Sequence, residues 1–217
     1  MRWYVLRLRR GKRTIFSNFI SLSRKEIGLR ETKFELVGAF HCYPRYNGGV
    51  SFAIRDFQPV DFETLWLIDQ TCFPAGISYS RAELKIYMRR HTAFTLVAHT
   101  TIEDGKALSG ADKKTAWSGK SDIVGFIVAE AGPRGRGHII TIDVVAAVRR
   151  FGVGSLLLRG AEDRLLSAKS STVELETAVD NVSALSFYKR HGYSVIKIFP
   201  RYYSNGVDAL VLEKRLV

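Results

Sequence analysis

The sequence predicts one α/β domain built on a mixed, mostly antiparallel sheet. Two features of the apolar pattern predict it: strand-like runs joined by loops come first, and the second half alternates strictly between strand and helix patterns. Strands joined by loops pair antiparallel, whereas a strand–helix–strand unit makes its two strands parallel. A length of 217 residues suits a single well-buried core with an appendage.

Turn and cap signals place the individual elements. Pro59 opens the first helix, and Ser80 with Glu83 forms a capping box for the second. Gly192 supplies a left-handed C-terminal cap for the last helix, and the polar segment 103–122 is expected to be a surface hairpin loop. The expected strands cover about 51–55, 93–100, 123–130, 138–145, 172–179, 193–198 and 209–213, and the expected helices about 59–72, 80–88, 154–168 and 181–191.

The positive charge of the chain is concentrated at its N-terminal end. Residues 1–50 contain 11 Lys and Arg against 3 Asp and Glu, a net charge of +8, while residues 51–217 carry 22 against 18. We therefore expect a basic extension over 1–50 and a globular domain over 51–217. A basic extension can contact the ribosome, nucleic acid or another anionic surface, or act as a transit peptide. The sequence favours a solvated tail, which a start codon assigned too early would also produce.

Cysteine and histidine usage argues against several kinds of site. The two cysteines, Cys42 and Cys72, are too few for a disulfide framework or a metal cluster, which fits a reducing cytoplasm. Cys72 lies in no motif that supports nucleophilic catalysis. No window approaches the roughly 18 apolar residues of a membrane span, so no membrane contact is expected. The histidines lack metal-ligand spacing, so no metal is expected and no function is assigned to His41, His91, His99, His138 or His191.

The turn over residues 149–154 is the most informative segment. It reads Arg149-x-x-Gly152-x-Gly154 and joins an apolar run, 139–145, to an amphipathic run. A strand that turns through two glycines into a helix leaves unpaired backbone N–H groups and the positive end of the helix dipole at one point. Because glycine has no Cβ, a bulky pyrophosphate can approach the backbone. The turn therefore predicts a phosphorylated cofactor.

Four stretches, in order, share one family resemblance that covers about residues 52–216. They are Ile54-Arg55 with Asp61 and Cys72-Phe73-Pro74, the turn at 149–154, Leu175-Glu176 with Asn181 and Tyr188 to Tyr193, and Tyr202 to Ala209. Together they resemble the GNAT-type N-acetyltransferases, and more narrowly the RimI-type N-terminal acetyltransferases. The resemblance implies the GNAT fold: a mixed, mostly antiparallel sheet of six to seven strands with about four helices, splayed between the fourth and fifth strands.

The resemblance also implies acetyl transfer from acetyl-CoA. Glu176 corresponds to the general base that takes a proton from the amine, and Tyr188 to the general acid that serves the departing thiolate. Glu174 shares a strand face with Glu176, so one of the two can simply be solvated. The expected cofactor contacts are the backbone of Ile142, Asp143 and Val144, a backbone nest, and Asn181, which also N-caps its helix. The nest is formed by the N–H groups of Arg150, Phe151, Gly152, Val153, Gly154 and Ser155, and the side chains of Arg149 and Arg150 are expected to add positive charge to it.

The acceptor side carries the least sequence information. Phe73, Pro74, Tyr202 and Tyr203 are expected to line the groove for the amine, although a purely structural loop fits the two tyrosines nearly as well. The favoured acceptor is a protein N-terminal α-amine. A lysine, a small amine, and a non-catalytic module that only binds acetyl-CoA are the alternatives.

Overall fold

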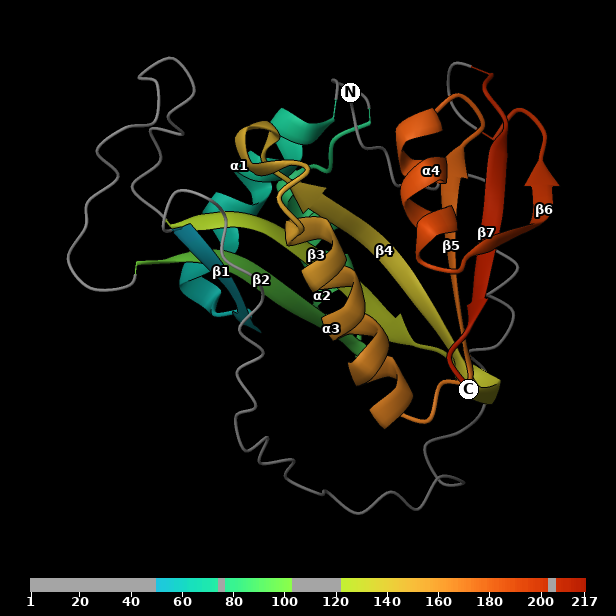
Figure 1. The fold of residues 1–217 in the computed structure, drawn as a ribbon, viewed down its shortest axis with the longest axis horizontal. Coiled ribbons are helices and arrows are strands. Elements are labelled where there is room, and N and C mark those ends of the chain that lie inside the picture. The colour runs from blue at the N-terminus through green and yellow to red at the C-terminus, as the bar shows by residue number, and fades with distance from the viewer. Residues whose placement is uncertain (1–49, 74–76, 103–121, 203–205) are drawn as a thin grey trace.

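The protein forms a seven-stranded sheet with helices on both faces (Figure 1). This computed structural model describes residues 50–73, 77–102, 122–202 and 206–217. The basic extension up to residue 49, Pro74, the predicted loop over 103–121 and Tyr203 lie outside the described residues. The strands lie in the order β1-β2-β3-β4-β5-β7-β6. They are β1 Val50–Asp56, β2 Ala93–Ile102, β3 Ile123–Ala131, β4 Arg136–Val144, β5 Thr172–Ala178, β6 Ser194–Phe199 and β7 Ala209–Arg215.

Two of the four helices begin at side-chain caps that the sequence predicts. Ser80 Oγ accepts from Glu83 N at 3.3 Å, and Glu83 Oε2 accepts from Ser80 N at 3.0 Å, which is the predicted capping box. Asn181 Oδ1 accepts from Ala184 N at 3.1 Å at the start of the last helix. Pro59 begins a 3₁₀ turn that leads into the first helix. The helices are α1 Phe62–Cys72, α2 Arg81–Met88, α3 Val153–Ser167 and α4 Val182–Arg190.

The helices divide between the two faces of the sheet. Figure 1 shows α3 and α4 in front of it and α1 and α2 behind it. Helix α3 packs on β2, β3 and β4, where a Cβ added to Gly137 would lie only 2.7 Å from Leu165 Cδ1. The core between these layers is fully buried and includes Phe126, Ile127 and Leu157. This close packing fixes the C-terminal part of α3 against the start of β4.

The sheet opens between β4 and β5. These two strands are parallel, and they pair only from Arg136 to His138 against Thr172 to Glu174. Beyond that point each strand continues without the other, while β5 stays paired with β7 along its whole length. The GNAT fold predicted from the sequence, with its splay between the fourth and fifth strands, is confirmed.

Every strand differs from its predicted bounds by one or two residues at one end or both, and β4 and β7 show why. Strand β4 begins at Arg136, two residues before the expected start, because the preceding turn ends there: Arg134 and Gly135 have φ of 59° and 69°. Strand β7 runs on to Arg215, which pairs with Thr172. Pairing with a partner strand extends both elements beyond what local apolar alternation signals.

Candidate active site

The turn between β4 and α3 presents the N-terminal end of a 15-residue helix. Gly152 has φ of 87° and precedes α3 with no side-chain cap, and the first backbone hydrogen bond of the helix runs from Leu156 N to Gly152 O. The N–H groups of Val153, Gly154 and Ser155 therefore have no partner within the helix. They lie at the positive end of the helix dipole, where anions bind.

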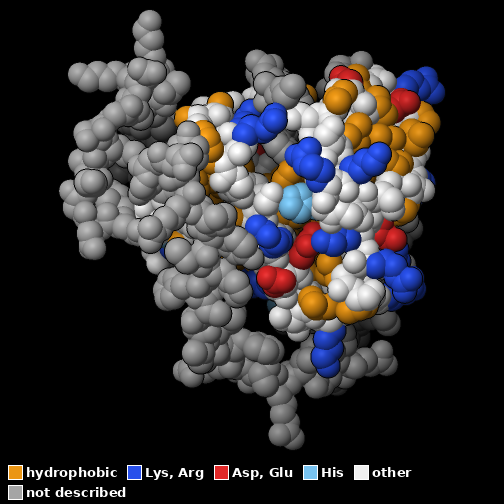
Figure 2. Space-filling view, viewed as in Figure 1, with side chains coloured by type: hydrophobic (Ala, Val, Ile, Leu, Met, Phe, Trp, Pro, Cys, Tyr) orange, Lys and Arg blue, Asp and Glu red, His pale blue; other side chains and the backbone are white. Residues whose placement is uncertain are grey.

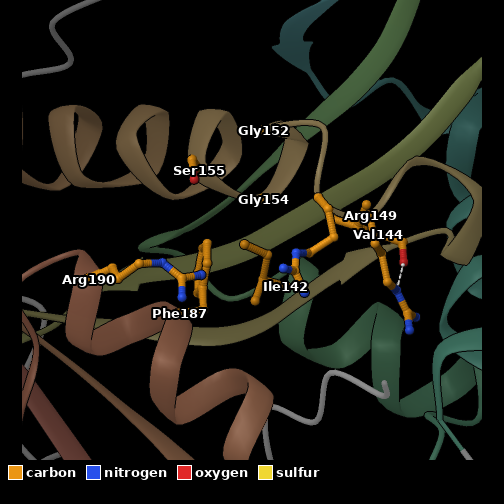
Figure 3. Close-up of a pocket in the computed structure, with 9 residues that line it drawn as sticks. Ile142, Val144, Arg149, Gly152, Gly154, Ser155, Phe187 and Arg190 are labelled. Carbon is orange, nitrogen blue, oxygen red and sulfur yellow. Dashed lines mark hydrogen bonds between the residues drawn. The ribbon is translucent and has the colours of Figure 1, made fainter. Parts of the chain in front are cut away.

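A pocket of about 180 Å³ lies beside this turn (Figure 3). Sequence reasoning missed two of its residues, Phe187 and Arg190, both from α4. The two side chains reach the pocket because of how α4 packs against α3, which no local motif reveals. The packing is close: a Cβ added at Gly154 would lie 3.6 Å from the Phe187 ring. The lining residues are Ile142, Val144, Arg149, Arg150, Gly152, Gly154, Ser155, Phe187 and Arg190.

Four residues predicted for the cofactor do not line this pocket. Phe151 is exposed, Val153 is buried, and Asn181 is buried as the N-cap of α4. Asp143 is fully buried, and its Oδ2 accepts from Thr141 Oγ1 at 3.2 Å. The roles predicted for Phe151, Val153 and Asp143 involve their backbone groups and not their side chains.

The Arg149 side chain turns toward the end of β4. Its Nε donates to the Val144 carbonyl at 2.8 Å, as the dashed line in Figure 3 marks, and its Nη2 lies 3.5 Å from Cys72 Sγ. Arg149 therefore ties the turn to β4 and α1. Burial raises the pKa of the Cys72 thiol to about 12, so this thiol stays protonated, which argues against a nucleophilic role.

Positive charge gathers over the face that carries α3 and α4. Figure 2, viewed from this side, shows Lys and Arg side chains spread across it. Arg150 and Arg190 add two such charges to the pocket itself. A cationic rim attracts phosphorylated ligands over distances beyond direct contact.

Glu176 lies on β5 and contacts a histidine to which sequence reasoning assigned no function. The side-chain Nε2 of His138 is 2.8 Å from Glu176 Oε2, and both side chains are mostly buried, with 23% and 16% exposure. Alternation along β5 places Glu176 on the face away from the buried Val173 and Leu175. His138 comes to the same face because it pairs with Glu174, two residues before Glu176. The strand register, which the sequence does not give, is what joins the two residues.

A second carboxylate holds the other side of the His138 ring. Glu130 Oε1 lies 3.8 Å from His138 Nδ1 and accepts from Arg90 Nη1 at 2.8 Å. Burial alone lowers the pKa of His138, but the two carboxylates outweigh burial and raise this pKa to about 10. At neutral pH, His138 is therefore an imidazolium between two glutamates.

This imidazolium predicts a pH dependence of stability. Because the pKa of His138 is raised in the folded state to about 10, its stabilisation is complete below the unfolded value of about 6.5 and is lost as the pH rises through 10. We expect His138→Gln to remove on the order of 1–3 kcal/mol from the free energy of unfolding at pH 6.5 and little at pH 10. Urea unfolding of both proteins across this range measures it; parallel curves would contradict it.

Tyr188 lies on α4, close enough to Asp143 of β4 to be affected by its charge. It is fully buried on α4, and its hydroxyl has no hydrogen-bond partner among the described residues. Burial, and then the nearby Asp143 carboxylate, raise its pKa well above the usual value, so the hydroxyl keeps its proton. Its ring meets those of Phe187 and Tyr193 edge-on, at centroid distances of 5.2 and 5.4 Å. The phenol is thus held rigidly with an unused donor.

Two of the residues predicted for the acceptor groove are described. Phe73 is 5% exposed and packs in the core at the end of α1. Tyr202 stacks on Phe199 with a centroid distance of 5.7 Å. Burial, and then Glu176 and Tyr87, raise the pKa of Tyr202, so Tyr202 lies close enough to Glu176 to be affected by its charge. Of the two, Tyr202 is the one near the predicted base.

In the described ranges, no group of three or more His, Cys, Asp or Glu side chains is arranged to hold a metal ion. Within those same residues, no helix combines the length and the apolar character that crossing a membrane requires.

This fold and site belong to a known class of protein. Residues 63–193, more than half of the chain, match the acetyltransferase (GNAT) family, so the chain belongs to this family. It is 37% identical over 94 residues to an uncharacterised N-acetyltransferase of Methanocaldococcus jannaschii. The aligned region covers 43% of this chain and 60% of that protein. It is 25% identical over 167 residues to an N-alpha-acetyltransferase of Sulfurisphaera tokodaii, which covers 76% of this chain and 93% of the relative.

Solved structures show the same fold. Ard1 from Thermoplasma volcanium matches with a TM-score of 0.60 at 26% sequence identity, over 76% of this chain and 98% of that one. A chain of the NatC complex, solved with Gag peptide and CoA, matches with a TM-score of 0.60 at 22% identity, over 76% of this chain and 99% of that one. The fold of this protein is thus one that these structures share.

Proposed function

We propose that this protein is an acetyl-CoA-dependent N-acetyltransferase whose acceptor is a protein N-terminal α-amine. One observation carries the proposal: the sheet opens between β4 and β5, with the uncapped start of α3 following β4 and the Glu176–His138 pair at the point where the two strands part. A donor thioester and an acceptor amine that enter from opposite sides would meet at that opening.

The pocket residues fit the phosphorylated part of the coenzyme. The free N–H groups at the start of α3 suit its pyrophosphate, and Arg150 and Arg190 suit its negative charge. Beyond His138, β4 does not pair with β5, and this edge suits the pantetheine arm, which would bind the backbone of Ile142 to Val144. When bound, the coenzyme supplies the acetyl group as a thioester.

Glu176 is proposed as the general base. An α-amine has a pKa of about 7.7–8.0, so at neutral pH most of the acceptor is ammonium and must lose a proton before it can attack. The Glu176 carboxylate can take this proton directly or through water. His138 acts as a positioning residue, because its imidazolium lies 2.8 Å from Glu176 Oε2 and fixes the orientation of that carboxylate.

Tyr188 is proposed as the donor to the leaving sulfur. A phenol whose pKa lies above its usual value of about 10 does not transfer its proton completely to a thiolate, whose ordinary pKa is about 8.5. It stabilises the developing negative charge through a hydrogen bond instead. A backbone N–H near Val144 would serve the oxyanion of the carbonyl in the same way.

Support for the α-amine comes from one relative. The Sulfurisphaera tokodaii protein is an N-alpha-acetyltransferase that aligns over most of both chains. Tyr202 beside Glu176 fits a groove that closes over a peptide. The RimI type expected from the sequence remains part of the proposal, as does a contact of the basic extension with the ribosome or nucleic acid.

An acceptor screen with the full chain tests the proposal. Thiol release from acetyl-CoA is followed with peptides that begin with Ala, Ser or Met, with the same peptides blocked at the α-amine but containing lysine, and with polyamines. We expect turnover only with free α-amines. Turnover with lysine or polyamines alone would move the acceptor to those classes, and coenzyme binding without any turnover would support a non-catalytic module.

Arg150 provides a separate prediction for the coenzyme site. Its φ of 74° is a left-handed conformation that costs an L-residue about 1–2 kcal/mol, part of which glycine recovers. We expect Arg150→Gly to raise the free energy of unfolding by about 0.5–1 kcal/mol and to weaken coenzyme binding by about 3–10-fold. Denaturant unfolding and calorimetry measure the two effects.

Lys169 is the matched control for Arg150. It also has a positive φ, 63°, but it follows the far end of α3 and does not line the pocket. Lys169→Gly should therefore give a similar gain in stability and leave coenzyme affinity unchanged. Equal affinity loss in both variants would mean that the Arg150 charge does not contact the coenzyme.

A further inference from the structure

A histidine outside the proposed chemistry contacts the anion-binding end of α3. Ser155 lines the pocket as the third residue of α3, and its Oγ lies 2.9 Å from Nε2 of His191. The Ser155 backbone N–H is also one of the free donors at that helix end. A ligand anion held there would lie within a few ångströms of both the hydroxyl and the imidazole.

The ring of His191 is held in place by its surroundings. Its centroid is 4.6 Å from that of Phe187, which itself lines the pocket. The backbone N–H of His191 donates to the Tyr188 carbonyl at 2.9 Å, and Gly192, with φ of 86°, ends the helix directly after it. The orientation toward Ser155 is therefore a feature of how α4 ends, where the chain turns toward β6.

Charged groups from three elements face this ring. Arg159 and Glu162 come from α3, Arg190 precedes His191 on α4, and Lys214 comes from β7. Glu162 accepts hydrogen bonds from Lys214 and from Tyr193, so its charge is largely balanced. Burial first and then the three cations lower the pKa of His191, against the effect of Glu162. The ring is therefore neutral at pH 7 in the free protein.

Bound phosphate reverses this balance. A pyrophosphate at the start of α3 places two negative charges beside Ser155 and offsets the cations that disfavour imidazolium. In the neutral ring, Nε2 can accept a hydrogen bond from the Ser155 hydroxyl. In the imidazolium, Nε2 must donate to Ser155 Oγ, so the hydroxyl can turn its own hydrogen toward the ligand. The added proton comes from solvent, and no covalent bond changes.

We propose that His191 is a positioning residue for the coenzyme and that it takes up a proton when pyrophosphate binds at the N-terminal end of α3. The protonated ring then donates from Nε2 to Ser155 Oγ, and the Ser155 hydroxyl donates to the phosphate. The inference rests on the proposed function, because the coenzyme is the ligand. It makes coenzyme affinity dependent on pH. Affinity rises as the pH falls from 8 to 6, by up to about tenfold for each unit by which the bound ligand raises the His191 pKa.

Calorimetry in two buffers tests this inference. The full chain is titrated at pH 7 with dephospho-CoA, in two buffers that differ in ionisation enthalpy, and with CoA in parallel. Dephospho-CoA keeps the pyrophosphate but lacks the 3′-phosphate, which titrates near pH 6 and would release protons of its own. We expect uptake of a fraction of one proton for each dephospho-CoA bound.

Variants assign the proton to the residue. His191→Gln keeps an N–H donor for Ser155 but cannot titrate, so we expect no proton uptake and an affinity that no longer rises at low pH. His91→Gln, in an exposed turn, should behave as the original chain does. Ser155→Ala, which breaks the link while keeping His191, should weaken binding most at low pH, and it serves as the second test where His191→Gln is unstable.

The outcomes separate this inference from the proposed function. Binding without proton uptake, or equal uptake by the original chain and His191→Gln, overturns the role of His191. Binding of CoA but not of dephospho-CoA also overturns it, because the 3′-phosphate rather than the pyrophosphate would then hold the ligand. Failure to bind either compound leaves no coenzyme site at all, and the proposed function fails with it.

Discussion

Glu176→Gln is expected to lower kcat for acetyl transfer by about 10²–10⁴-fold and to leave coenzyme affinity unchanged. The amide has nearly the same shape as the carboxylate and can still meet His138 at 2.8 Å, but it cannot accept a proton from the amine. Initial rates with the best peptide and calorimetry with acetyl-CoA measure the two quantities. The loss should shrink as the pH rises, because more of the acceptor then arrives as free amine.

Glu174 provides the matched control. It lies two residues earlier on the same face of β5, where its Oε1 is 3.8 Å from Arg136 Nη1 and its backbone pairs with Glu213. Glu174→Gln removes the same charge from the same strand face, so we expect less than about a threefold change in kcat. Comparable losses of kcat in both variants would show that this face of β5 affects catalysis only through its overall charge. Glu176 would then not be the general base.

The geometry of the turn between β4 and α3 was predictable because it is local. Six consecutive residues specify the glycine with positive φ and the uncapped start of α3, and the pocket forms beside them. The role of a side chain within that turn was less predictable. Arg149 bonds the Val144 carbonyl, a contact that depends on how the turn folds back on β4.

His138 could not be assigned from the sequence because its partner is distant in the chain. Glu176 lies 38 positions away, and the contact arises only from the parallel register that pairs His138 with Glu174. A one-residue slip would turn the imidazole to the other face. Phe187 and Arg190 were missed for a related reason, since they reach the pocket through helix packing. Tyr188 was found through a family resemblance, whereas its lack of a bonding partner is a property of the packed core.

Tyr188→Phe is expected to stabilise the protein and slow the reaction. The hydroxyl is buried with no partner among the described residues, and an unsatisfied buried polar group costs about 1–3 kcal/mol. Removing it should therefore raise the free energy of unfolding of the ligand-free protein by about 1 kcal/mol or more. The same change removes the proposed donor to the leaving sulfur and should lower kcat by about 10²–10³-fold. Urea unfolding and initial rates measure the two effects.

Tyr193 supplies the opposite case in the same aromatic cluster. Its hydroxyl is also buried, but it donates to Glu162 Oε1 at 2.9 Å. Tyr193→Phe should therefore lower the free energy of unfolding by about 1.5–3 kcal/mol, the usual value of a bond to a charged group, with a much smaller effect on kcat. Opposite signs for two tyrosines whose rings touch would identify the Tyr188 hydroxyl as a group kept for a ligand rather than for folding. A loss of stability in both variants would mean that the Tyr188 hydroxyl has a structural partner and is not kept as a donor to the leaving sulfur.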